Sequence, residues 1–325
     1  MFLKRLIRRG AASVIMLLSL VTIVFFLVRF VPGDPTHQYY SPKLGSELAD
    51  RIKTQFGLDQ PVHVQFVKWL GNLVQGDLGY SLSFRKPVTN VIFTALPVTL
   101  TLAILALIFQ MILGILFGTL AGANPNSKLD KTINAGSLIL YCAPSFLIGL
   151  FLIYFGSVKL GWFPTSHLHS TGYEELSPMM QFLDFVHHIF LPVITLTITS
   201  AAFTTRFVRE SLLNILNQPF ITALRSTGLG EKKLILSHAL PNSLLPLITL
   251  FGIEIGSLLG GALITETIFS LPGLGRLTVD AIFARDYPLI IGCTMISGFM
   301  VILGNFIADM LHAKLDARVS FETIG

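Results

Sequence analysis

Charged residues are scarce in this sequence, and their scarcity excludes a water-soluble fold. They make up 13% of the 325 residues, while 52% are hydrophobic, whereas about a quarter of an ordinary soluble domain is charged. We therefore predict an all-α integral membrane protein, long enough for about six spans of roughly 20 residues each. The net charge of +5 comes from basic residues scattered at the ends of apolar runs, which argues against nucleic-acid binding.

Residues typical of catalysis and metal binding are also few. The two cysteines, Cys142 and Cys293, lie in apolar runs and indicate neither a disulfide framework nor a metal-binding pair. The chain has no GxxxxGK(S/T), HExxH, GxSxG or CxxC pattern, so we expect no ATP site, no nucleophile and no cofactor on it. Histidines gather between residues 167 and 188, but their spacing fixes no ligand geometry, and we predict no metal site.

Six long apolar runs are present, and an even number of spans places both chain ends on the same side of the membrane. The first run follows four basic residues, is too long for the apolar part of a signal peptide and is not followed by a small-residue cleavage site, so we take it as a retained span. Two of the runs contain Pro144 and Pro192, which kink or start helices without forbidding them in a bundle. The runs cover residues 10–28, 95–121, 135–158, 189–207, 243–269 and 289–311.

The basic residues predict the orientation of these spans, because short cytoplasmic loops are enriched in lysine and arginine. If the N-terminus is cytoplasmic, the lysines and arginines of the short outer segments are only Lys159, Arg276 and Arg285. The cytoplasmic segments then contain many more, namely Lys4, Arg5, Arg8, Arg9, Lys128, Lys131, Arg206, Arg209, Arg225, Lys232, Lys233, Lys314 and Arg318. We therefore predict that both termini are cytoplasmic, as is the loop 207–242. The long polar segment 32–94, with short amphipathic helices at 46–56 and 62–74, is predicted to lie outside.

The loop 207–242 is the longest polar interruption in the C-terminal two-thirds of the chain. Pro219 is placed to start a helix and Gly228 to stop it. An apolar stripe at i, i+3, i+4 and i+7 follows from Phe220, Ala223, Leu224 and Thr227, whereas Arg225 falls off it. A second helix is predicted from Glu231 to Leu240, ending before Pro241. Such short helices are marginal alone, so the stripe either folds back on the membrane domain or meets a partner.

Several ordered motifs resemble one family along nearly the whole chain. The pattern of Thr222, Ala223, Leu224, Gly228, His238, Ala239, Leu240 and Pro241 looks like the EAA loop of permease subunits of binding-protein-dependent ABC importers. Other motifs resemble those of the dipeptide, oligopeptide and nickel branch of this family. They are PGDP at 32–35, GLDQP at 57–61, GDLG at 76–79, ETIFSLPGLGR at 266–276 and RDYP at 285–288. Two departures concern the loop: its Glu-Ala-Ala positions are Thr222, Ala223 and Leu224, and residues 225–228 are RSTG instead of the more usual RAKG.

The resemblance implies a fold, a set of partners and a class of cargo. The fold would be the six-span, MetI-like fold of type I ABC importers, divided into residues 1–94, a permease core at 95–311 and a cytoplasmic tail at 312–325. The partners would be a second permease subunit, two ATPase subunits that bind ATP and magnesium, and an extracytoplasmic binding protein, in the inner membrane of a prokaryote. Peptides are the expected cargo, with nickel chelates or glutathione as alternatives. The residues expected to couple to the ATPase are Phe220, Ala223, Leu224, Arg225, Gly228, His238, Leu240 and Pro241.

Glu254 is the acidic residue predicted to lie deepest in the membrane. An unpaired carboxylate there costs about 2.5 to 3.5 kcal/mol on insertion scales, so it should face protein or water. It either lines a translocation path, where it meets an amino group or a cation, or makes a buried helix contact. In a different class of protein, an ion-coupled secondary transporter, Glu254 would be the coupling carboxylate. That class often shows inverted repeats, and the sequence contains no internal repeat.

Overall fold

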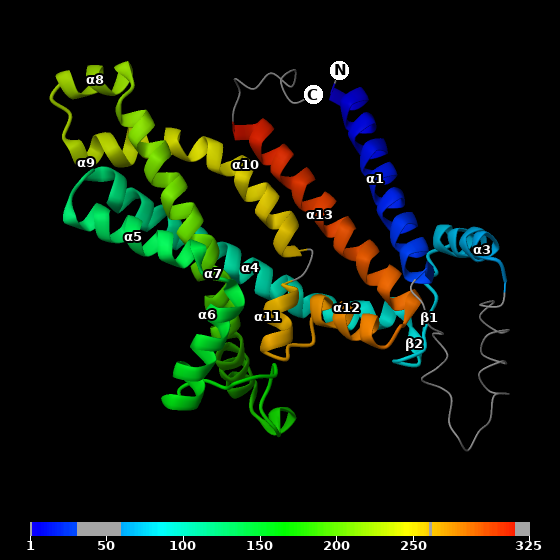
Figure 1. Cartoon of the computed structure of the whole chain (residues 1–325). Coiled ribbons are helices and arrows are strands. Elements are labelled where there is room, and N and C mark those ends of the chain that lie inside the picture. The colour runs from blue at the N-terminus through cyan, green and yellow to red at the C-terminus, as the bar shows by residue number, and fades with distance from the viewer. Residues whose placement is uncertain (1, 31–59, 260–261, 316–325) are drawn as a thin grey trace. The chain divides into compact units, whose positions relative to one another are not determined.

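The computed structural model describes residues 2–30, 60–259 and 262–315, and within them the regular secondary structure is helical apart from one pair of short strands (Figure 1). The strands, β1 (Tyr80–Ser81) and β2 (Lys86–Pro87), are antiparallel. The helices are α1 (Phe2–Phe30), α3 (Val62–Val74), α4 (Val88–Ala123), α5 (Lys128–Cys142), α6 (Ser145–Leu152), α7 (Pro178–Leu216), α8 (Pro219–Ser226), α9 (Glu231–Leu234), α10 (Leu240–Leu259), α11 (Leu263–Ile268), α12 (Leu274–Phe283) and α13 (Tyr287–Leu315).

Four of the described helices are long and apolar enough to cross a membrane, which confirms an all-α membrane protein. They are Gly10–Phe30, Val88–Ala123, Pro178–Leu216 and Tyr287–Ile307. A bent pair, Lys128–Cys142 with Ser145–Lys159, makes a fifth if it is one span. The described residues therefore show four or five spans, against six predicted. The predicted span 243–269 falls on α10 and α11, which are separate helices.

The predicted span 135–158 is not a straight helix. α5 and the segment that begins with α6 meet at an angle of 100°. Ala143 between them is extended, with ψ of 130°, because a residue that precedes a proline is disfavoured in the helical region. Pro144 then caps the N-terminus of α6. The chain continues from α6 through a π-helical segment, Ile153–Lys159.

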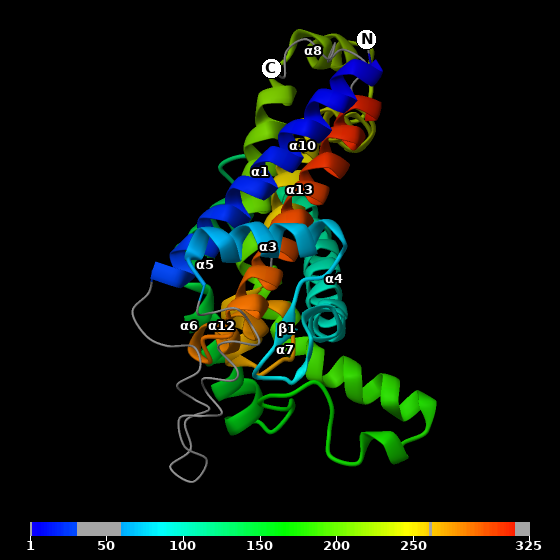
Figure 2. The same ribbon diagram turned by 90° about the vertical axis from the view of Figure 1, so that its right-hand side faces the viewer.

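The chain forms two compact units, the first made of residues 1–99 and 272–302. In it, α1 and α3 pack together (Figure 2). Phe25 of α1 is fully buried and in edge-to-face contact with Phe66 of α3. The predicted helix 62–74 is thus confirmed as α3, whereas the predicted helix 46–56 lies outside the described residues. Asp286 links the hairpin to the start of α13, because its Oδ2 accepts hydrogen bonds from Ser81 Oγ at 2.6 Å and from the backbone N–H of Ser83 at 3.0 Å.

The second unit contains residues 100–271 and 303–325. In its described part, α7 packs against α5, α6, α10 and α11. The C-terminal half of α4 approaches α7 closely at glycines: a Cβ atom added to Gly118 would lie 2.7 Å from the carbonyl oxygen of Thr205. Small residues let membrane helices approach each other in this way. This unit carries the loop 207–242 and Glu254.

Candidate functional site

The loop 207–242 contains a helix with the predicted start and stop. α8 begins at Pro219, the first helical position, where a missing N–H costs nothing. It ends before Gly228, which has φ of +82°. That left-handed conformation is open to glycine at little cost, and it turns the chain toward α9. Both predicted boundaries are confirmed.

The two faces of α8 have different surroundings. Ile221 is fully buried against Leu212 of α7 and Leu234 of α9, and Leu224 packs on the same cluster. On the other face, Phe220 has 42% of its surface exposed, and Ala223 and Thr227 are exposed as well. The predicted stripe is therefore divided, since Leu224 folds back on the chain's own unit. The rest of the stripe stays accessible.

Arg225 and Glu231 form an ion pair across the turn between α8 and α9. Their Nε and Oε1 atoms are 2.5 Å apart, and both side chains are exposed. The hydrogen bond from Arg225 lowers the pKa of the Glu231 carboxyl, and it raises the pKa of the Arg225 guanidinium. The pair therefore favours the tight turn at Gly228 as long as Glu231 is ionised.

The predicted second helix does not end before Pro241. α9 continues through a π-helical segment, Ile235–Ala239, directly into α10 at Leu240. The wider turn of a π-helical segment is one way in which a helix accommodates a disruption, and Pro241 follows immediately, on an exposed part of the first turn of α10. His238 and Leu240 are half-buried on this continuous helical run. Pro241 thus does not end the helix.

Sequence reasoning missed an ion pair between α5 and α7. Arg209 donates to both carboxylate oxygens of Asp130, from Nε at 2.5 Å and from Nη2 at 2.9 Å. Only 3% of the Asp130 side chain and 14% of the Arg209 side chain are exposed. Asp130 also accepts the backbone N–H of Asn126, and its own N–H donates to Ser127 Oγ, the N-cap of α5. The spacing of Ser127 and Asp130 matches a capping pattern, but nothing local points to Arg209.

Glu254 lines a pocket in the same unit. Its Oε2 accepts a hydrogen bond from Nε2 of Gln110, a fully buried residue of α4. The pocket has a volume of about 460 Å³ and receives residues from both sides of the α5–α6 bend, from α7 and from α10. Its lining residues are Tyr141, Ala143, Ser145, Thr199, Ser200, Phe203 and Glu254. The structure thus places Glu254 away from the coupling loop, at a cavity.

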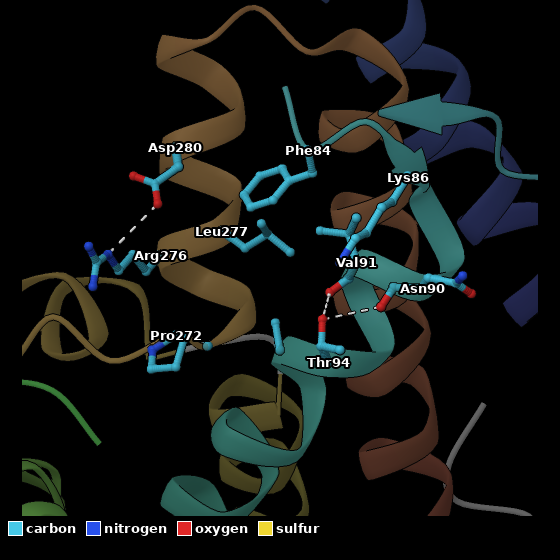
Figure 3. Close-up of a pocket in the computed structure, with 11 residues that line it drawn as sticks. Phe84, Lys86, Asn90, Val91, Thr94, Pro272, Arg276, Leu277 and Asp280 are labelled. Carbon is cyan, nitrogen blue, oxygen red and sulfur yellow. Dashed lines mark hydrogen bonds and ion pairs between the residues drawn. The ribbon is translucent and has the colours of Figure 1, made fainter. Parts of the chain in front are cut away.

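A second pocket, of about 590 Å³, lies in the first unit between the start of α4 and α12 (Figure 3). Phe84, Val91 and Leu277 point into it, and Lys86 lies at its edge. Arg276 lies 3.7 Å from Asp280 on α12. The residues that line this second pocket are Phe84, Lys86, Asn90, Val91, Thr94, Ala95, Pro272, Gly273, Arg276, Leu277 and Asp280. The predicted orientation assigns this pocket to the outer side of the membrane.

The histidines between residues 167 and 188 do not form a ligand cluster. His169 and His188 lie 3.7 and 3.4 Å from carboxylate oxygens of Asp184, and His188 Nδ1 also lies 2.8 Å from the carbonyl oxygen of Asp184. In the parts of the chain that the structure covers, no group of three or more histidine, cysteine or acidic residues could hold a metal ion. Asp184 is instead engaged by Ser170, whose Oγ donates at 2.5 Å.

Known structures share the fold. A chain in the structure entitled "Inward facing conformations of the MetNI methionine ABC transporter" matches with a TM-score of 0.54 and 19% identity, over 70% of this chain and 97% of that chain. A chain of an amino acid ABC transporter determined with histidines matches with a TM-score of 0.52 and 19% identity, over 70% and 94% of the two chains. At this identity the likeness concerns the fold alone, and it confirms the MetI-like permease fold.

Sequence comparisons cover nearly the whole chain. The chain is 41% identical to the oligopeptide transport system permease protein AppB of Bacillus subtilis (strain 168) over 97% of its length and 99% of AppB. It is 35% identical to the di/tripeptide transport system permease protein DppB of Pseudomonas aeruginosa (strain UCBPP-PA14) over 92% and 94% of the two chains. The model of the binding-protein-dependent transport system inner membrane component matches residues 114–321, and the model of its N-terminal part matches residues 2–103. The chain therefore belongs to the family of binding-protein-dependent transport system inner membrane components, the non-catalytic permease subunits of ABC transporters.

Proposed function

We propose that this chain is the permease subunit of an importer that translocates short peptides through the inner membrane. The observation that carries the proposal is the 41% identity to an oligopeptide permease over 97% of the chain. Other relatives of similar length are also described as peptide permeases. This similarity favours peptides over nickel chelates or glutathione.

The proposed complex contains a second permease subunit, two ATPase subunits and an extracytoplasmic binding protein. α8 is the docking element for an ATPase, since Phe220, Ala223 and Thr227 leave one face of a short amphipathic helix accessible. An amphipathic helix laid into a groove is a common mode of recognition. The opposite face is anchored through Ile221, so that movement of the ATPase reaches α7 and α9. Both chain termini and α8 are placed in the cytoplasm, on the strength of the charge distribution.

Reconstitution tests the proposed activity. The purified permease pair, its ATPases and its binding protein are placed in liposomes, and uptake of radiolabelled dialanine is followed with ion gradients collapsed. We expect uptake that requires ATP on the ATPase side and stops without the binding protein. Uptake that follows an ion gradient and ignores ATP would support the secondary-transporter alternative. Absence of peptide uptake, with uptake of a nickel chelate or glutathione, would refute the peptide assignment.

The coupling role of the α8–α9 turn is tested by Gly228→Asp. Aspartate at φ of +82° costs modest backbone strain and adds a negative charge to the turn that the Arg225–Glu231 ion pair spans. We expect ATP hydrolysis to continue while dialanine uptake falls at least tenfold. Gly230→Asp is the matched control. It adds the same charge two residues away, at the N-cap of α9 with φ of −63°, where aspartate is favoured. Normal uptake by an inserted Gly228→Asp protein would remove the turn from the coupling mechanism.

A further inference from the structure

The pocket lined by Glu254 contains several hydrogen-bond acceptors within a mostly apolar lining. The Thr199 hydroxyl donates to the carbonyl oxygen of Leu196 at 3.1 Å, so toward the pocket it has only lone pairs to offer. Ser145 and Ser200 add two further hydroxyl oxygens to the lining. The carboxylate of Glu254 completes a set of oxygens contributed by α6, α7 and α10.

Within the described ranges, no cation of the chain neutralises the charge of Glu254. Among the residues that the structure describes, no lysine, arginine or histidine forms an ion pair with it, and its recorded partner is Gln110. Gln110 is fully buried, and its Oε1 has no hydrogen-bond partner within the described residues. A buried amide whose oxygen is left over is costly, so its retention beside Glu254 points to a role in holding the carboxylate.

These features suit a primary ammonium group. An ammonium has three donors and no acceptor, so it is bound by several acceptor oxygens together with one negative charge. The volume of about 460 Å³ falls within the range of roughly 300 to 1,000 Å³ that is usual for small-molecule sites. One carboxylate and a few hydroxyls fall short of the six or more oxygen ligands that calcium takes, which argues against a hard metal ion.

Part of the pocket wall is aromatic. The rings of Tyr141 and Phe203 are stacked with their centroids 6.0 Å apart, at the end of α5 and on α7. Such a wall offers apolar contact to side chains of varied size, and an aromatic face also attracts cations. The 100° bend after Cys142 is what brings Tyr141 and Ser145 to one pocket from two helix segments.

We propose that this pocket binds the protonated amino terminus of a peptide during its passage, with Glu254 as the counter-ion and Gln110 as the residue that positions it. The inference rests on the proposed function, since it names the part of the cargo that the permease contacts. It also explains how one pocket accepts peptides of different sequence, because every unblocked peptide carries an amino terminus. The aromatic wall leaves the rest of the peptide unspecified.

The test measures binding to the permease itself, without delivery by the binding protein. Ala143 lines the pocket, and Ala143→Cys places a thiol there without removing a polar group. Cys142→Ala removes the exposed native thiol. In the purified complex with its ATPases, protection of this cysteine from a methanethiosulfonate reagent is measured with dialanine and with N-acetyl-dialanine. We expect dialanine to protect at a concentration about tenfold lower, the magnitude of a hydrogen-bonded charge contact.

Glu254→Gln keeps the shape of the side chain and removes its charge. It should raise the dialanine concentration for half-protection about tenfold and leave that for N-acetyl-dialanine unchanged. Glu174→Gln, an exposed position of the same unit, is the control and should change neither. Equal protection by the two peptides in the protein with Glu254 intact would overturn the proposal, and this comparison does not depend on how the variant folds. Failure of ATP-dependent dialanine uptake by the unmutated complex would instead refute the proposed function.

Discussion

At the scale of single residues, the ion pair of Asp130 and Arg209 shows how strongly the stability of the fold depends on each buried charge keeping its partner. Both side chains are largely covered, and removal of Asp130 leaves Arg209 with only the exposed carboxylate of Glu210 as an ion-pair partner. We expect Asp130→Ala to cost about 2 to 3 kcal/mol of stability, the usual penalty for stranding a hydrogen-bonded charge. The measurement is thermal unfolding of the detergent-solubilised permease.

A double variant separates the charge effect from the loss of packing. Asp130→Ala with Arg209→Leu removes both charges, and buried ion pairs replaced by apolar residues are often tolerated. We therefore expect the double variant to unfold at a higher temperature than Asp130→Ala alone. An equal or lower unfolding temperature would mean that the pair contributes through the N-terminus of α5, where Asp130 accepts the N–H of Asn126, and not through its charge balance.

At the scale of elements, α8 has one face for folding and one for docking, and two substitutions distinguish them. Ile221→Ala removes a fully buried side chain from the cluster with Leu212 and Leu234, so we expect a loss of about 2 to 4 kcal/mol of stability. Phe220→Ala, on the exposed face, should leave the unfolding temperature unchanged and weaken ATPase binding. Sedimentation of the ATPase with the permease checks the second effect. Destabilisation by Phe220→Ala would contradict this division of faces.

The close approach of α4 and α7 depends on a glycine. A Cβ on Gly118 would lie 2.7 Å from Thr205 O and 2.7 Å from Val208 Cβ, so Gly118→Ala should destabilise the unit by about 1 to 3 kcal/mol through overpacking. Gly136→Ala is the matched control in α5. Nothing lies within 4 Å of the added methyl group there, and alanine favours a helix by about 1 kcal/mol over glycine. The unfolding temperatures of the two variants should therefore shift in opposite directions.

Elements whose limits are set by local chemistry were predictable from the sequence. α8 follows from Pro219 and Gly228, and α3 from its amphipathic period. The 100° bend was not predicted, because Pro144 by itself allows a kink, a helix start or an uninterrupted helix. The continuation of α9 into α10 was missed since Pro241 was treated as a stop, whereas the preceding π-helical segment accommodates it.

Only those parts of the candidate site whose residues lie close together in the sequence were predictable. The coupling residues lie within a few turns of one another, and their ordered motifs carry the resemblance to the family. Gln110 and Arg209 were missed because their partners, Glu254 and Asp130, are 144 and 79 residues away. A single sequence contains no signal for such pairs, since periodicity and capping patterns extend over a few turns at most.

At the scale of the whole molecule, the proposed orientation assigns each loop to one side of the membrane. Cysteines at exposed positions test it in the Cys142→Ala background, with Ser226→Cys for the cytoplasmic loop and Thr171→Cys for an outer segment. A membrane-impermeant maleimide applied to intact spheroplasts should label Thr171→Cys alone. Lysed membranes should show both labelled. Labelling of Ser226→Cys from outside would invert the topology and remove the docking role of α8.

The uninterrupted helical run from Glu231 to Leu259 has a mechanical consequence. Glu254 is 23 residues after Glu231, a distance of about 35 Å at the helical rise of 1.5 Å per residue. The run contains the π-helical segment and, in α10, Pro241 and Pro246, but no non-helical break. Movement at the α8–α9 turn can therefore pass along continuous helix to the carboxylate. We therefore expect each cycle of ATP hydrolysis to rotate Glu254 relative to Gln110. Binding and release of the peptide at this pocket would then be synchronised with ATP hydrolysis.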